Sequence, residues 1–83
     1  MRLLYFASVR QTIGLAGEEI TLPGDVVDAG GLVDWLKRRG GVYAEALAQP
    51  GHVRVAVNQA YGHAGTPVTD DDEVALFPPV TGG

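Results

Sequence analysis

The first stretch of the chain is a nearly continuous apolar run from Leu3 to Val9, which is typical of a strand buried on both faces. Arg10 to Gly14 follows and is interpreted as a polar turn. From Glu18 to Leu22, polar and apolar residues alternate, and this pattern stops at Pro23-Gly24. We therefore expect two strands, joined in the manner of a hairpin, at the start of the fold.

The clearest helical pattern lies in the middle of the chain, where apolar residues recur at the i, i+3, i+4 and i+7 positions of one face: Ala29, Leu32, Val33 and Leu36. Asp28 stands where an N-cap is wanted, because its side chain can accept hydrogen bonds from free backbone N–H groups. Lys37 to Arg39 complement the dipole of the last turn, and Gly40-Gly41 can supply a left-handed stop. Gly30-Gly31 cost roughly 1 kcal/mol each against alanine, so this helix depends on tertiary packing.

The second half of the chain alternates between strand patterns and turn residues. Tyr43 to Leu47 favours one further helical turn. Val53 to Val57 alternates in hydrophobicity and predicts a strand with one buried face. Asn58 to Thr66 is interpreted as a glycine-containing loop, and Asp70-Asp71-Asp72 as a turn. The last strand is expected from Glu73 to Phe77.

The order of these elements, strand, strand, helix and then strands, predicts an α+β fold. We expect a ubiquitin-like β-grasp domain over residues 1–77, with one main helix packed across a mixed sheet of about five strands. Pro78-Pro79 end the last strand, because neither proline can donate to a ladder. Residues 78–83 are then expected to form a flexible, protruding C-terminal tail.

Composition narrows the function classes. The 83 residues suffice for one domain with one small core. Ten acidic and six basic residues give a net charge of −4 without a basic stripe, so nucleic-acid binding is not expected. No apolar stretch is long enough to span a membrane, and we expect a cytoplasmic protein. The chain has no cysteine, which excludes disulfides, zinc–thiolate sites and thioesters on a side chain.

Side chains that could catalyse a reaction are scarce. His52 and His63 lie in predicted loops, and neither has a carboxylate or second histidine at the spacing of a ligand set, which favours solvated loop residues. The run from Asp70 to Glu73 lacks the alternation of a calcium loop and is better interpreted as a solvated turn. We therefore expect no metal site and no independent enzyme, since no acid–base pair or nucleophile constellation is present.

The C-terminal carboxylate is the remaining candidate for chemistry. Gly82 and Gly83 carry no side chain that could obstruct a narrow channel. From Pro78 to Gly83 an extended chain reaches roughly 20 Å, which is enough to enter another protein's active site. The carboxylate is ionised at neutral pH and could attack the α-phosphate of ATP to form an acyl-adenylate. The Gly-Gly ending alone is weak evidence, because a frayed terminus in a glycine-rich chain would look the same.

Further motifs give this ending its meaning. Residues 70–83, Asp-Asp-Asp-Glu-Val-Ala-Leu-Phe-Pro-Pro-Val-Thr-Gly-Gly, resemble the C-terminal block of molybdopterin synthase small subunits, in the MoaD/ThiS family of sulfur carriers. Residues 6–10, Phe-Ala-Ser-Val-Arg, followed by Gly14, resemble that family's Phe-Ala-x-x-Arg-x-x-x-Gly segment. Residues 56–59 are similar to its third-strand motif, and residues 28–36 to its helix start. The resemblance extends over the whole chain and is most specific at its end.

The resemblance implies a sulfur carrier that does not catalyse alone. A ubiquitin-activating-like partner enzyme would adenylate Gly83 with ATP, and sulfur transfer would convert the adenylate to a thiocarboxylate. Gly83 would bear the sulfur, Gly82 would clear the channel, and Thr81 and Val80 would complete the tail. The large subunit of molybdopterin synthase, in a heterotetramer, would receive this tail for sulfur transfer to cyclic pyranopterin monophosphate. No bound cofactor is implied, because the partner enzyme uses the ATP.

A docking face is expected beside the tail. One helix of about three turns cannot cover both faces of the sheet, and exposed apolar patches usually mark interfaces. Unless loops fold over them, we expect the partner-binding residues to include Phe6, Phe77, Val80, Pro78 and Pro79. Arg10 could pair with an acidic partner surface, or it could be a solvated loop arginine.

Three other functions stay open. A carrier of sulfur for the thiamine thiazole would have a similar fold and ending, although the Phe-Ala-x-x-Arg and Phe-Pro-Pro-Val-Thr segments argue against it. A modifier of the ubiquitin type would be joined to lysines through the same terminus. A plain interaction module would carry an inert tail. The sequence also departs from the family where Asp71 replaces a turn glycine, and we expect the turn to survive because aspartate tolerates the left-handed region.

Overall fold

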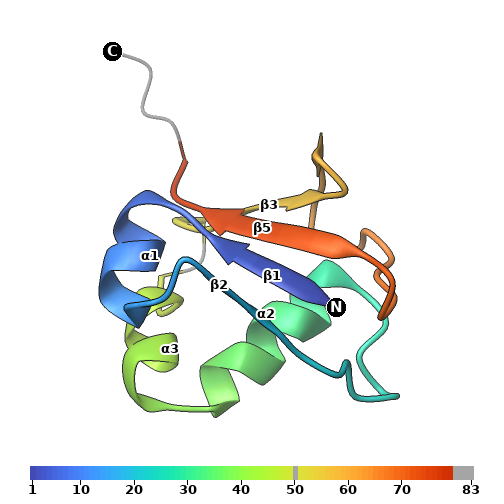
Figure 1. Cartoon of the computed structure of the whole chain (residues 1–83), viewed down its shortest axis with the longest axis horizontal. Coiled ribbons are helices and arrows are strands. Elements are labelled where there is room, and N and C mark those ends of the chain that lie inside the picture. The colour runs from blue at the N-terminus through green and yellow to red at the C-terminus, as the bar shows by residue number, and fades with distance from the viewer. Residues whose placement is uncertain (50, 80–83) are drawn as a thin grey trace.

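The described part of the chain, residues 1–49 and 51–79 of a computed structural model, forms a five-stranded mixed sheet with α2 and α3 on one side of it (Figure 1). The elements in chain order are β1 (Arg2–Tyr5), α1 (Ala7–Ile13), β2 (Gly17–Glu19), α2 (Ala29–Arg38), α3 (Gly41–Ala46), β3 (Arg54–Val57), β4 (Ala60–Tyr61) and β5 (Glu73–Phe77). The predicted α+β class, with one main helix across a mixed sheet, is confirmed.

The central strand of the sheet is β5, although it is the last strand in the chain. The strand order is β2-β1-β5-β3-β4. β5 pairs in parallel with β1, where Tyr5 lies opposite Leu76, and antiparallel with β3, where Arg54 lies opposite Phe77. Because both edges of β5 are paired, the segment that follows it leaves from the interior of the sheet.

The main helix, α2, begins and ends as the sequence predicts. The Asp28 side chain accepts a hydrogen bond of 2.7 Å from the Gly31 N–H, which is the predicted N-cap. Beyond α2, both Gly40 and Gly41 adopt positive φ, of 76° and 55°, and turn the chain into α3. A left-handed glycine stop is therefore confirmed, with Gly40 one residue beyond the C-cap Arg39.

Gly30 is a poor residue for helix propensity, but its lack of a side chain is used in packing. Its N–H donates to the Ala64 carbonyl at 2.8 Å, which ties the loop before β5 to the first turn of α2. A Cβ at this position would lie 3.1 Å from the Ala64 Cβ, closer than ordinary van der Waals contact. The unusual glycine at the helix start thus permits a close approach of helix and loop.

The prediction for residues 3–14 was wrong in its second half. β1 ends at Tyr5, and the residues expected to finish the strand and form a polar turn are instead α1. Val9 and Ile13 stand four positions apart on α1, and both are buried. In such a short apolar run, the hydrophobic pattern does not distinguish a helix from a strand. Ala7 starts the helix with a φ of 51°, and Gly14 ends it with a φ of 86°.

Smaller differences lie in the loops. β2 covers residues 17–19 and stops before the predicted end at residue 22. The predicted loop 58–66 contains β4, because Asn58 and Gln59 both adopt positive φ and form the two-residue turn of a β3–β4 hairpin. Asp71 does not adopt a positive φ, so the reason given for its tolerance in the turn was wrong. The turn needs no left-handed residue at that position.

The core lies between the sheet and the helices. Its most completely buried side chains come from β1, β5 and α2: Leu3, Tyr5, Val74, Leu76, Leu32 and Leu36. These residues alternate with exposed or half-buried ones along each strand, as the pleat requires. The side of the sheet that faces away from α2 and α3 therefore carries the other half of each strand's residues.

One carboxylate links four elements at the edge of this core. Glu18, on β2, accepts hydrogen bonds from the Tyr5 and Tyr43 hydroxyls at 2.8 and 2.6 Å. The Arg39 guanidinium lies 3.2 Å from its other oxygen and stacks over the rings of Trp35 and Tyr43. Burial alone would raise the pKa of Glu18, but the hydrogen bonds from Tyr43, Tyr5 and Arg39 outweigh it and hold that pKa below its usual range.

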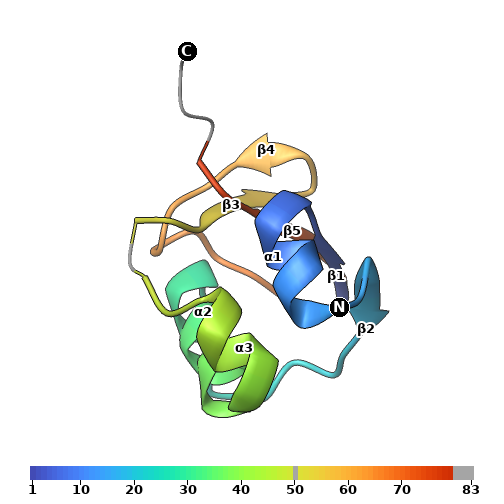
Figure 2. The same cartoon turned by 90° about the vertical axis from the view of Figure 1, so that its left-hand side faces the viewer.

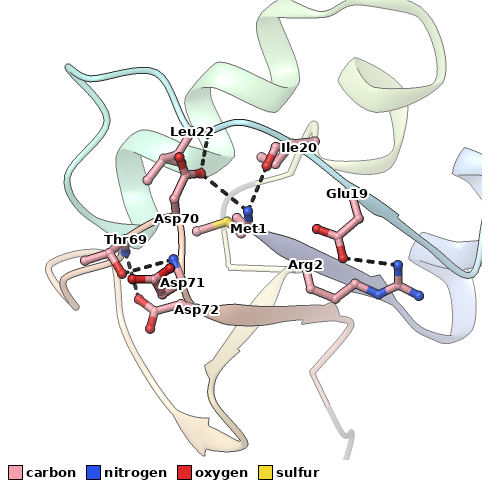
Figure 3. Close-up of polar contacts among 9 residues, drawn as sticks. All are labelled: Met1, Arg2, Glu19, Ile20, Leu22, Thr69, Asp70, Asp71 and Asp72. Atoms are coloured by element: carbon pink, nitrogen blue, oxygen red, sulfur yellow. Dashed lines mark hydrogen bonds and ion pairs between the residues drawn. The ribbon is translucent and has the colours of Figure 1, made fainter.

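The acidic turn before β5 accepts hydrogen bonds that hold neighbouring segments in place. Figure 3 shows Asp70 accepting from the Leu22 N–H at 2.7 Å and lying 3.4 Å from the α-amino group of Met1. Asp72 accepts from the Thr69 N–H at 2.7 Å and closes the turn itself. These contacts favour the interpretation of this run as a turn.

Glu18→Gln should lower the free energy of unfolding at neutral pH by about 1–3 kcal/mol, because hydrogen bonds to a charged acceptor are lost. Glu19→Gln is the matched control, since Glu19 is exposed and makes one ion pair of 3.4 Å with Arg2. Its expected cost is below about 1 kcal/mol. Urea denaturation of the three proteins measures the difference, and equal losses for the two variants would contradict this role of Glu18.

The same pair gives a pH test. The pKa of Glu18 is lower in the folded chain than its ordinary value, so its contribution to stability is present above about pH 4.3. That contribution is lost as the pH falls through the folded-state pKa. The stability difference between the native chain and Glu18→Gln should therefore shrink in this acid range, and a constant difference would oppose the assignment.

Candidate functional site

The base of the C-terminal tail is the described part of the structure that lies nearest in sequence to the residues predicted to react. Phe77 ends β5, and the half-buried Pro78 and Pro79 follow it. The predicted tail residues, Val80, Thr81, Gly82 and Gly83, lie outside the described residues, so their roles stay predictions. The strand that leads to them is paired on both edges along its length.

The sheet face away from α2 and α3 is apolar near this base. Since side chains alternate along a strand, six apolar residues between the core positions point to this face: Leu4, Phe6, Ala56, Tyr61, Ala75 and Phe77. The same alternation places Arg54 on this face, opposite Phe77, and Arg2 and Glu73 at the start of β1 and β5. Phe6 is 47% exposed and Tyr61 is 83% exposed. The ring centroids of Tyr61 and Phe77 lie 5.9 Å apart, with an interplanar angle of 57°, as a tilted aromatic pair. We call the six apolar residues the open face.

The open face lies on the side of the sheet opposite the main helix. Figure 2 shows α2 and α3 on one side of the strands and β3, β4 and the end of β5 at the other extreme of the molecule. The predicted docking residues Phe6 and Phe77 both belong to this face. Phe6 is part of it because its N–H donates to the Leu76 carbonyl at 3.1 Å, which extends the β1–β5 ladder beyond Tyr5. Loops in the described residues do not cover Phe6.

Arg10 lies on a helix and not in the predicted loop. Its backbone N–H donates to the Phe6 carbonyl at 3.3 Å, so it stands one turn of α1 beyond the open face. Its side chain is exposed, and no carboxylate of the described residues lies within 4.0 Å of it. A cation therefore lies on the element adjoining this apolar surface.

A hollow lies beneath the base of the tail. It has a volume of ≈ 380 Å³ and is bounded by α1, α3, the following loop and the two prolines; its lining includes Ser8, Val9, Glu45, His52, Pro78 and Pro79. The prolines thus line a concave surface rather than standing free of the domain.

The acidic and histidine side chains of residues 1–49 and 51–79 are scattered over the fold. No three of these side chains are placed to hold a metal ion. His52 and His63 are exposed, as solvated loop residues would be, and the His63 Nδ1 accepts from the Gly65 N–H at 3.0 Å. None of the helices in this part of the chain is long and apolar enough to cross a membrane.

Sequence reasoning missed Tyr61, the most exposed aromatic residue of the open face. Its position follows from the β3–β4 hairpin, which sets Tyr61 opposite Ala56. The signal was the pair Asn58-Gln59, which leaves two residues between strands of alternating hydrophobicity. Treating this stretch as a loop removed Tyr61 from the expected sheet.

Comparisons with known proteins agree over nearly the whole chain. Residues 3–83 match the model of the ThiS family. The molybdopterin synthase sulfur carrier subunit of Escherichia coli (strain K12) is 39% identical over 83 residues, which cover 100% of this chain and 99% of that protein.

Solved structures agree with the fold as well. A protein from Pyrococcus furiosus, assigned as molybdopterin converting factor, subunit 1, has a TM-score of 0.77 and 30% identity, with 95% of each chain covered. SAMP1 from Haloferax volcanii has a TM-score of 0.74 and 27% identity, over 100% of this chain and 98% of that one. The β-grasp prediction is therefore confirmed.

Phe6→Ala should change the free energy of unfolding by no more than about 1 kcal/mol, because Phe6 is 47% exposed and lies outside the buried core. Leu76→Ala, on the core side of the adjacent strand, is fully buried and should cost about 2–5 kcal/mol. Denaturant titrations of the two variants measure the contrast. A cost for Phe6→Ala as large as that for Leu76→Ala would show that the open face is packed in solution.

Proposed function

The chain belongs to the ThiS family, and we propose that it is the sulfur carrier subunit of molybdopterin synthase, with its sulfur borne on Gly83. The full-length likeness to a molybdopterin synthase sulfur carrier subunit supports this function over a thiamine thiazole carrier. The name of that relative also supports a partner subunit. The chain itself would supply no catalytic side chain, and the catalytic residues would belong to that partner.

The chemistry follows from a terminal carboxylate. A carboxylate is a poor acyl donor, because its leaving group would be an oxide ion. A partner enzyme that uses ATP would convert it to an acyl-adenylate, with release of pyrophosphate. Sulfur would then displace AMP and leave a thiocarboxylate on Gly83. This group would donate its sulfur to cyclic pyranopterin monophosphate within the large subunit, where the dithiolene is built.

The observation that carries the proposal is that the open face lies at the base of the tail. Phe77 belongs to this apolar surface and is separated from the Gly-Gly ending by only a few residues. A partner that covers the open face would hold the last described residues against itself and fix the direction of the tail. Burial of apolar area would then supply the affinity, and the glycines would supply the reach.

Adenylation should be visible as a change in intact mass. When the chain is incubated with ATP, an adenylating enzyme and a sulfide source, one terminal oxygen should be replaced by sulfur. A variant lacking Gly83 should show no change, because its last residue falls short of the reacting position. An unchanged mass, with an enzyme active on another carrier, would contradict the carrier function.

Phe77→Asp should weaken binding to the large subunit by at least about tenfold, because it places a charge at the centre of an apolar contact. The matched control is Val27→Asp. Val27 is 64% exposed but lies outside the open face, in the segment before α2, where its carbonyl accepts from the Val68 N–H. Calorimetric titration compares the two variants, with circular dichroism to check that both remain folded. Equal affinities for Phe77→Asp and the native chain would remove the open face from the interface.

A further inference from the structure

Amines are unusually few in this chain. Of its six basic residues five are arginines, and Lys37 is the single lysine. A guanidinium stays protonated and is not a nucleophile at ordinary pH, whereas a primary amine can attack an activated acyl group. The chain also has no cysteine that could form a thioester. Two amines remain as acceptors of acyl groups, the Lys37 side chain and the α-amino group of Met1.

The α-amino group of Met1 is held within the fold. It donates to the Ile20 carbonyl at 2.8 Å and lies 3.4 Å from the Asp70 carboxylate (Figure 3). Met1 is only 6% exposed, and its side chain belongs to the core. An acylating group could reach this nitrogen only after β1 had moved away from its neighbours.

Lys37 has the opposite surroundings. It lies in the last turn of α2, is partly exposed, and borders a hollow of ≈ 500 Å³. Small residues make up part of the hollow's lining, among them Ala29, Gly30, Gly51 and Gly62. No carboxylate of the described residues lies within 4.0 Å of the Lys37 ammonium. A terminus without side chains can therefore approach this nitrogen without displacing an ion pair.

We propose that Lys37 is an acceptor site for an activated C-terminal glycine of this chain, and that in the folded chain it is acylated ahead of the α-amino group. The inference rests on the proposed function, which supplies the acyl-adenylate. The neutral Lys37 Nζ attacks the Gly83 carbonyl carbon, a C–N bond forms, and the bond from carbon to the phosphate oxygen breaks. AMP leaves, the nitrogen loses one proton, and an isopeptide bond results.

The two amines can be compared without any activating enzyme. In an unfolded chain the α-amino group is the more reactive amine near neutral pH, since less of it is protonated. We expect folding to reverse this order, so that acetyl N-hydroxysuccinimide labels Lys37 at least about tenfold faster than Met1. Peptide mass mapping of native and urea-unfolded chain reads both sites. Faster labelling of Met1 in the native chain would overturn the proposal.

The conjugate itself is tested with ATP and the adenylating enzyme in the absence of sulfide. Intact mass should show two chains joined with the loss of one water, or one chain cyclised with the same loss. Mapping should place the branch at Lys37, and Lys37→Arg, which keeps the charge, should abolish it. A parallel reaction with hydroxylamine reports activation of Gly83 separately, as a hydroxamate.

The parallel reaction separates the two ways of failing. A hydroxamate without any Lys37 branch would overturn the acceptor site and leave the carrier function in place. A branch at Met1, or one that persists in Lys37→Arg, would overturn it as well. If no hydroxamate forms, the carrier function fails, and with it the acceptor site that depends on the acyl-adenylate.

Discussion

The parallel pairing of β1 with β5 is the interaction on which the rest of the structure depends. It joins the first and last strands of the chain, with Tyr5 opposite Leu76, and places β5 at the centre of the sheet. The core residues of both strands then meet α2 on one side, and the open face is assembled on the other. Because this pairing is so distant in sequence, the sheet is complete only when the last strand is in place. The segment to which the proposed function assigns the chemistry therefore follows a strand that is paired on both edges.

The helices of the described residues cover only one side of the sheet, and the proposed function uses that asymmetry. The Glu18 carboxylate ties β2 to Tyr43 of α3 and to Arg39 at the end of α2, so these elements are fixed beneath the core. No helix within residues 1–49 and 51–79 covers Phe6 and Tyr61 in this way, and both are exposed. An apolar surface left open beside the end of β5 suits a subunit that binds a partner.

Elements with a long periodic pattern or a recognisable motif can be predicted from this sequence. Prediction fails in short segments, where a helix and a strand would show the same pattern. The α2 pattern with its Asp28 cap, the β5 strand and the open-face positions of Phe6 and Phe77 follow from spacing alone. The helix α1 did not, because Val9 and Ile13 fit a strand or a helix equally well until Ala7 turns the chain. Tyr61 was missed because a strand of two residues has no periodicity. The Glu18 network and the close contact of Gly30 with Ala64 join segments distant in sequence, so no local pattern reports them.

The transfer of sulfur itself tests the central claim most directly. The chain would be converted to its thiocarboxylate with radioactive sulfide, purified, and mixed with the large subunit and cyclic pyranopterin monophosphate in a single turnover. The proposed function predicts that the label leaves Gly83 and appears in the pterin product, with the chain returned to its carboxylate mass. Label that stays on the chain, while the thiocarboxylate of a known carrier is consumed under the same conditions, would contradict it.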